Sequence, residues 1–191
     1  VPDDMQGRMV VNIDPGTAFG TGMHETTQLV IKQLEKYVTP ETELLDVGTG
    51  SGILAVIAKM LGAKSIIGTD LDENAITASA ENMEANGFAP DIFKVIQGNI
   101  IDDKAVQDEV GYEKYDVVTA NILADVIMPL SKEIAQHIKH GGVFITSGII
   151  DMKEDAVKKT IMENPELEIV DVSHQGDWVS ITAVRKQTRE R

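Results

Sequence analysis

Short apolar runs alternate along this sequence with longer segments in which apolar residues recur every three or four positions. Runs of the first kind are typical of buried strands, and segments of the second kind are typical of amphipathic helices. The pattern predicts strands at 43–48, 65–70, 93–99, 115–121 and 143–148. It predicts helices at 25–37, 53–61, 73–86, 124–137 and 151–162. Asp151 and Glu154 have the spacing of a capping box at the start of the last helix.

The pattern changes near the end of the sequence. Two runs of alternating apolar and polar residues, 167–173 and 178–184, flank the residues His-Gln-Gly-Asp and predict a β-hairpin. Strands that alternate with helices form a parallel sheet covered on both faces. We therefore expect residues 1–191 to form one α/β domain, with a doubly wound, mostly parallel sheet and a C-terminal antiparallel β-hairpin. Such sheets bind ligands beyond the carboxyl ends of their strands, so the residues there are the candidate site.

Composition narrows the class of protein. The 191 residues are 42% hydrophobic and 25% charged, which is ordinary for a soluble globular domain. The sequence has no run of about 18 apolar residues, so it predicts no membrane span. The sequence has no cysteine and no signal-peptide pattern, which favours a cytoplasmic protein without disulfides or thiolate ligands. The four histidines have no metal-ligand spacing, so no metal is expected.

The net charge is −14, and only 4% of the residues are aromatic. An acidic surface repels phosphate backbones, and no basic block with interleaved aromatic residues is present. The sequence therefore predicts no direct binding of nucleic acid.

A glycine cluster, Asp-Val-Gly-Thr-Gly-Ser-Gly, follows the first predicted strand. Gly48, Gly50 and Gly52 form a G-x-G-x-G pattern, whereas a dinucleotide-binding turn would need a small residue where Ile53 stands. The P-loop pattern is also absent. The turn therefore favours a nucleoside ligand without a pyrophosphate, and a tight turn without any ligand is the alternative.

Three more strand ends have polar residues. Asp70 follows Gly48 by 22 residues, where a carboxylate can accept both hydroxyls of a ribose. The alternative for Asp70 is a helix cap, although Asp72 is also available for that task. Asn99 could bind an adenine edge or form a turn. Asn121 begins an unusually apolar loop, Asn-Ile-Leu, which would wall a reaction site and exclude water, or pack under the next helix.

The glycine motif, Asp70, the hairpin and the Asn-Ile-Leu loop together resemble the Rossmann-like S-adenosylmethionine-dependent methyltransferases. The motifs FGTGMHETT, LLDVGTGSGILAVIA, ANILADVI and GGVFITSGII are similar to those of the ribosomal protein L-eleven methyltransferase family (PrmA). This similarity extends over about 14–184. It implies the seven-stranded methyltransferase fold, S-adenosylmethionine as cofactor, and an enzyme that methylates Lys or α-amino groups of a ribosomal large-subunit protein.

The resemblance also implies roles for particular residues. The loop 19–27 would form one wall of the site, with Phe19 and His24 shaping it. Asn121 would be the catalytic residue, because its side-chain carbonyl could orient the lone pair of the attacking amine. The expected cofactor-binding residues are Thr27, Gly48, Gly50, Asp70, Asn99 and Asn121.

No dedicated general base is expected, because a low-dielectric pocket lowers the pKa of an amine and favours its neutral form. Asp125 and Glu25 are weaker candidates for a proton acceptor. His24 is expected to form structural hydrogen bonds.

Members of the family carry an N-terminal domain that engages the ribosomal protein, and we expect this domain to be absent here. Another protein, a small amine or a nucleobase is the alternative substrate. A non-catalytic nucleoside-binding module is the alternative class of protein.

Overall fold

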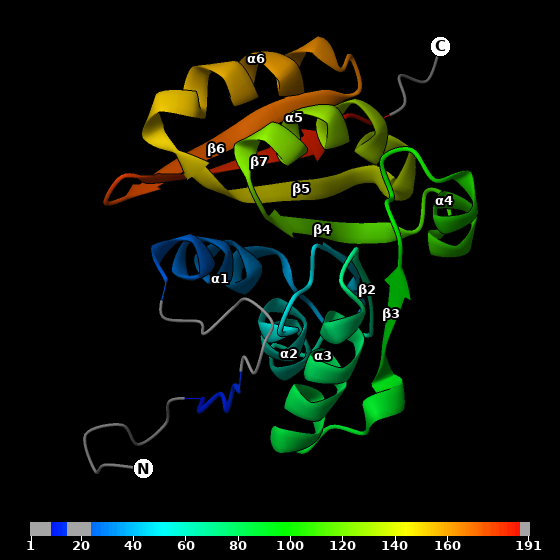
Figure 1. The fold of residues 1–191 in the computed structure, drawn as a ribbon. Coiled ribbons are helices and arrows are strands. Elements are labelled where there is room, and N and C mark those ends of the chain that lie inside the picture. Colours follow the sequence, from blue (N-terminus) through cyan, green and yellow to red (C-terminus); the bar gives the residue numbers. More distant parts are fainter. Residues whose placement is uncertain (1–8, 15–23, 188–191) are drawn as a thin grey trace.

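The computed structural model describes residues 9–14 and 24–187. Within these ranges, seven strands form one mixed sheet in the order β3-β2-β1-β4-β5-β7-β6 (Figure 1). The strands are β1 (Glu43–Val47), β2 (Ser65–Asp70), β3 (Phe93–Gln97), β4 (Tyr115–Asn121), β5 (Ile138–Ile150), β6 (Leu167–Gln175) and β7 (Trp178–Arg185). The α-helices are α1 (Glu25–Tyr37), α2 (Ile53–Met60), α3 (Glu73–Ala85), α4 (Lys104–Val110), α5 (Ala124–Glu133) and α6 (Glu154–Glu163). Three short 3-10 helices are η2 (Pro90–Ile92), η3 (Ile134–His137) and η4 (Asp151–Lys153).

The predicted doubly wound sheet with its terminal hairpin is confirmed. Strands β1 to β5 pair in parallel, and β7 pairs antiparallel to both β5 and β6. The chain builds outward from β1 through β2 to β3, and then crosses back to β4 on the other side of β1. The direction of winding therefore reverses between β1 and β4, and a crevice for ligands forms at such a switch point.

Helices cover both faces of the sheet, because the central strands are apolar on both sides. In β1, Leu44 belongs to a core with α1, α2 and α3, whereas Leu45 belongs to a core with α4, α5 and α6. Figure 1 shows α1, α2 and α3 on one side of the sheet, and α5 and α6 on the other. Successive side chains of a strand point to opposite faces, so these two buried leucines join the sheet to both helical layers.

The structure differs from the predicted elements in several places. Helix α4 was not predicted, because its buried face has only two large apolar residues, Val106 and Val110. Strand β5 begins at Ile138 rather than at 143, with a register shift between its pairings to Tyr115 and Val117. Gly141 and Gly142, which are typical of a turn, lie within this longer strand at the irregularity. Strand β3 ends at Gln97, two residues before the predicted end.

The predicted capping box at 151–154 was wrong. Residues Asp151–Lys153 form η4, and α6 begins only at Glu154, with Lys153 as its N-cap residue. The Asp151 carboxylate accepts a hydrogen bond from the backbone N–H of its neighbour Met152 instead. In the ranges that the structure describes, no helix has the length and apolar character needed to cross a membrane.

Candidate functional site

The predicted site residues outside the glycine turn lie at or near three strand ends and at the start of α1. Asp70 is the last residue of β2, and Asn121 is the last residue of β4. Thr27 lies in the first turn of α1, and Asn99 lies two residues after β3. The crossover between β1 and β4 brings these positions to the same edge of the sheet, which is where a switch-point ligand binds.

The glycine turn connects β1 to α2 with backbone angles that glycine adopts readily. Gly48, Gly50 and Gly52 have φ angles of 72°, 54° and 78°, in the left-handed region. A Cβ atom at Gly48 would lie 2.5 Å from Cγ2 of Ile122, in the loop after β4. The absence of a side chain at Gly48 thus allows the loop that begins at Asn121 to pack closely against the turn.

The Asp70 carboxylate is fixed against this turn. Its Oδ2 accepts a hydrogen bond from the backbone N–H of Gly50 at 2.8 Å, and its Oδ1 accepts one from the backbone N–H of Asp72 at 2.9 Å. Each carboxylate oxygen has a further lone pair for a ligand hydroxyl. The side chain is half-buried, so a ligand on the turn can still reach it.

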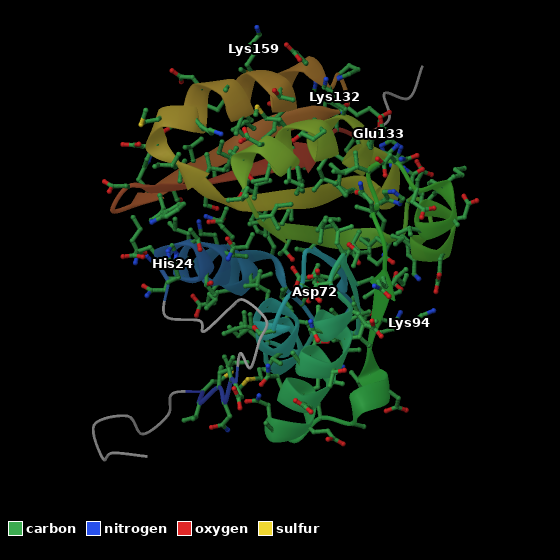
Figure 2. The ribbon with its side chains drawn as sticks, viewed as in Figure 1. His24, Asp72, Lys94, Lys132, Glu133 and Lys159 are labelled. Atoms are coloured by element: carbon green, nitrogen blue, oxygen red, sulfur yellow. The ribbon has the colours of Figure 1, made fainter. Side chains whose placement is uncertain are left out.

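Asp72 rather than Asp70 caps the following helix. Its Oδ1 accepts a hydrogen bond from the backbone N–H of Asn74 at 2.9 Å, and Figure 2 shows Asp72 at the beginning of α3. Asp72 therefore fills the helix-cap role that was the alternative for Asp70. Asp70 is left with the geometry expected of a ribose-binding carboxylate.

Asp46 lies under the glycine turn and was not among the predicted site residues. Its carboxylate is buried and accepts hydrogen bonds from the hydroxyls of Thr119, at 2.6 Å, and Thr49, at 2.7 Å. Burial raises the pKa of Asp46 to about 6, although both hydroxyls act to lower it, and the nearby charge of Asp70 raises it further. The signal in the sequence was a carboxylate inside an otherwise apolar strand.

Asn121 contacts the first turn of α1. Its side-chain amide donates a hydrogen bond to the Thr27 hydroxyl at 3.3 Å. The buried Ser147 hydroxyl, near the end of the next strand, donates to the backbone carbonyl of Thr26 at 2.9 Å. The Ser147 carbonyl in turn accepts a hydrogen bond from the backbone N–H of Ile122 at 3.1 Å. Ser147 was missed in the sequence, because only its neighbours in space distinguish it from other strand serines.

His24 has the structural role that the sequence indicated. Its Nδ1 caps α1 by accepting a hydrogen bond from the backbone N–H of Thr26 at 3.2 Å. Its ring meets Trp178 edge to face, with 5.0 Å between ring centroids. Figure 2 shows His24 at the beginning of α1. Phe19 and the rest of the loop 15–23 lie outside the described residues.

Asn99 forms a turn in this structure. Its Oδ1 accepts a hydrogen bond from the backbone N–H of Ile101 at 3.1 Å. The preceding residue, Gly98, donates its backbone N–H to the carbonyl of Asp70 at 2.8 Å, so this turn lies beside the end of β2. The contact with an adenine edge stays a prediction.

A shallow groove of about 510 Å³ lies at the opposite edge of the sheet. Lys139 in this groove bonds to Glu43 at 3.0 Å and to Asp116 at 2.9 Å, near the amino ends of β1 and β4. The carboxyl ends of the parallel strands β1 to β5 do not contribute to it, so it is not the site that the switch point defines.

The site residues have the chemistry that a bound S-adenosyl group requires. The Asp70 carboxylate has spare acceptor capacity for two ribose hydroxyls, and the glycine turn beside it presents bare backbone. The sheet order, with β7 inserted antiparallel between β5 and β6, is that of the class I methyltransferases. The fold and site therefore define the class of S-adenosylmethionine-dependent methyltransferases.

The family follows from comparison with known proteins. The model of the family described as "Ribosomal protein L11 methyltransferase (PrmA)" matches residues 2–186, and this chain belongs to that family. The chain is 62% identical, over 96% of its length, to the ribosomal protein L11 methyltransferase of Lachnospira eligens, and 51% identical, over 95%, to that of Agathobacter rectalis. It spans only 58% and 57% of the lengths of these two relatives.

A solved structure supports the same assignment. The crystal structure of ribosomal protein L11 methylase from Lactobacillus delbrueckii subsp. bulgaricus superposes with a TM-score of 0.82 at 33% identity. The match covers 94% of this chain and 86% of that one. The resemblance identified in the sequence is therefore confirmed.

Proposed function

We propose that residues 1–191 form the catalytic domain of a protein N-methyltransferase that transfers methyl groups from S-adenosylmethionine to Lys or α-amino groups of ribosomal protein L11. The observation that best supports this proposal is the Asp70 carboxylate held on the glycine turn by the Gly50 N–H at 2.8 Å. The relatives at 62% and 51% identity are methyltransferases of that substrate by name.

In this proposal the cofactor lies along the edge formed by the glycine turn and the strand ends. Asp70 accepts the ribose hydroxyls, and the backbone of Gly48 and Gly50 allows the nucleoside to approach. Thr27 and Asn121, which already share a hydrogen bond, contact the cofactor from the side of α1 and β4. Asn99 contributes its amide near the adenine. S-adenosylmethionine supplies an electrophilic methyl group on a positively charged sulfur.

The chain's own residues position and desolvate the attacking amine. The amine must be neutral, so that its lone pair can form the new N–C bond while the C–S bond breaks and the thioether leaves. The Asn121 amide nitrogen is used toward Thr27, and its carbonyl oxygen can accept a hydrogen bond from the amine and aim the lone pair. Ile122, which packs against the glycine turn at Gly48, excludes water, and positioning and desolvation are the main catalytic contributions.

A dedicated base is not required by this geometry. The Asp125 carboxylate is exposed and ion-paired with Lys153, with N···O distances of 2.6 and 2.7 Å, so it is poorly suited to accept the proton. The proton released after transfer passes to solvent. A ribosomal substrate is consistent with action in the cytoplasm, and the net charge of −14 argues against direct contact with RNA.

The test is to incubate the chain with ribosomal proteins and isotopically labelled S-adenosylmethionine, followed by mass spectrometry. Labelled methyl groups on amines of L11 are the expected result. Label found only on another protein or on a small amine would show that L11 is not the substrate. Binding of S-adenosylhomocysteine without transfer to any candidate would favour a nucleoside-binding module. NAD should cause no thermal shift.

A further inference from the structure

Large apolar side chains lie exposed next to the proposed methyl-transfer site. Leu123, just before α5, is 71% exposed, and Met152, in η4, is 87% exposed. Val126 and Ile150 are also exposed. We call these four residues the apolar platform. Such groups of exposed apolar side chains are typical of protein-binding surfaces.

An ion pair shows that the two segments carrying the platform are adjacent. Lys153, adjacent to Met152, forms an ion pair with Asp125, which lies between Leu123 and Val126 in sequence. Ile150 ends β5 and pairs with Trp178 of β7. Figure 1 shows the end of β5, the beginning of α6 and the beginning of α1 on the same side of the molecule.

The platform adjoins the residue proposed to aim the amine. Leu123 follows Asn121 by two residues, and the Ile122 N–H between them is bonded to the Ser147 carbonyl at the end of β5. Trp178, the partner of Ile150, contacts His24 at the start of α1, three residues before Thr27. The platform residues therefore lie on segments adjacent to Asn121 and to the start of α1.

Negative charges predominate around the platform. The segments 24–27, 121–126, 150–155 and 176–178 together contain six carboxylates and one lysine. The turn 176–178 joins this surface directly, because the Asp177 carbonyl accepts a hydrogen bond from the Asp151 N–H at 2.9 Å. A partner with several lysines is attracted to such a surface, and a partner rich in carboxylates is repelled.

We propose that the apolar platform is the docking surface for the protein substrate, with apolar substrate residues near the target lysine packing on Leu123 and Met152. The surrounding carboxylates attract the neighbouring lysines of that substrate. This inference rests on the proposed function, and it adds where the acceptor protein binds and which chemistry selects it. Selection then depends on the side chains that flank the target amine as well as on the amine.

The test compares Met152→Gln and Leu123→Gln with a matched control, Met162→Gln. Met162 is 62% exposed in the last turn of α6, and so tests loss of an exposed methionine outside the platform. Burying one or two CH₂ groups contributes roughly 0.8 kcal/mol each, so each platform variant should raise the KM for L11 by about four- to fifteenfold. The kcat, and the Kd for S-adenosylhomocysteine, should change little, and the control should behave as wild type.

Binding of L11 in the presence of S-adenosylhomocysteine is measured separately by calorimetry. Absence of methyl transfer by the wild-type chain, with L11 still bound, would overturn the proposed function but leave the platform supported if Met152→Gln weakens binding. Equal L11 affinity of Met152→Gln, Leu123→Gln and Met162→Gln would overturn the platform. No binding of L11 to the wild-type chain would overturn the platform, whereas the proposed function is judged by methyl transfer. The KM should also rise with salt, because screening weakens the attraction of lysines to the carboxylates.

Discussion

The side chains of Asn121 and Thr27, 94 residues apart in sequence, meet in a hydrogen bond of 3.3 Å between the end of β4 and the first turn of α1. This bond uses the amide nitrogen of Asn121 and holds the carboxamide in one orientation. The carbonyl oxygen is then available for the hydrogen bond that aims an amine.

Replacement of Asn121 should therefore affect turnover more than cofactor binding. Asn121→Ala removes the carbonyl that we propose to position the amine, and misplacement of a reacting group costs about a hundredfold in rate. The measurement pairs kcat with the calorimetric Kd for S-adenosylhomocysteine. Thr27→Val, which keeps the carbonyl but removes its partner, should show a smaller loss of kcat. A proportionate loss of affinity and turnover in Asn121→Ala would show that Asn121 serves binding alone.

Asp70→Ala should weaken cofactor binding by about 1–3 kcal/mol, the range for leaving a hydrogen-bonding group without its partner. Both the ribose hydroxyls and the Gly50 N–H lose their acceptor. Asp72→Ala is the matched control, because it removes a carboxylate two residues away that caps α3. It should cost about 1 kcal/mol of stability and leave the affinity unchanged. Unchanged affinity in Asp70→Ala would exclude Asp70 from ribose binding.

Gly48→Ala should destabilise the turn more than Gly87→Ala destabilises the end of α3. The two glycines have similar φ angles, 72° and 81°, so both alanines carry a similar backbone cost of about 1–2 kcal/mol. Only at Gly48 does the new Cβ meet a neighbour, Cγ2 of Ile122 at 2.5 Å, whereas nothing lies within 4 Å at Gly87. Urea denaturation measures the loss of unfolding free energy in each of the two variants.

The second variant for this test is the double substitution Gly48→Ala with Ile122→Ala. Ile122→Ala removes the Cγ2 that the new Cβ would meet. In this background, Gly48→Ala should therefore lower the free energy of unfolding by about as much as Gly87→Ala does in the wild-type protein. Equal destabilisation by Gly48→Ala and Gly87→Ala would mean that the loop after β4 moves aside without cost.

The contribution of the buried Asp46 carboxyl to the free energy of unfolding should fall as the pH rises. Its folded-state pKa of about 6 exceeds the ordinary 3.8, so the folded protein binds this proton more tightly than the unfolded chain does. The contribution to the free energy of unfolding falls as the pH rises from 3.8 through 6, by about 2 kcal/mol between pH 4 and pH 8. Asp46→Asn does not titrate, so the wild-type stability minus that of the variant should fall over this window. A constant difference from pH 4 to pH 8 would show that the pKa is not raised.

Much of the fold could be predicted from apolar periodicity. Helix α1 has the predicted limits, 25–37, because His24 provides a cap and the buried positions recur at helical spacing. The hairpin was predicted from alternation, and β6 and β7 flank the turn as expected. Helix α4 was missed because seven residues with two large buried apolar side chains give little periodicity. Strand β5 was predicted too short, since Gly141 and Gly142 are typical of a turn but here lie within the strand.

The site was predictable where one residue type at a strand end suffices, as for Asp70 and the glycine turn. It was not predictable where contacts between distant segments decide the role. Ser147 binds Thr26 across 121 residues, and the raised pKa of Asp46 depends on burial that only the folded sheet provides. Asp151 was assigned to a cap by spacing alone, whereas its carboxylate binds the adjacent N–H.

The braced position of α1 has a consequence for how a newly synthesised molecule matures. Gln33 of α1 donates a hydrogen bond to Asp171 of β6 at 2.8 Å, and Lys32 donates to Gln175 at 3.0 Å, so the first helix of the described residues is anchored on the C-terminal hairpin. While a ribosome is still translating the segment before that hairpin, α1 lacks these two hydrogen bonds, although α2, β4 and β5 are already available to pack against it. The final position of α1, and of Thr27 in its first turn, should therefore be reached only when the hairpin completes the sheet.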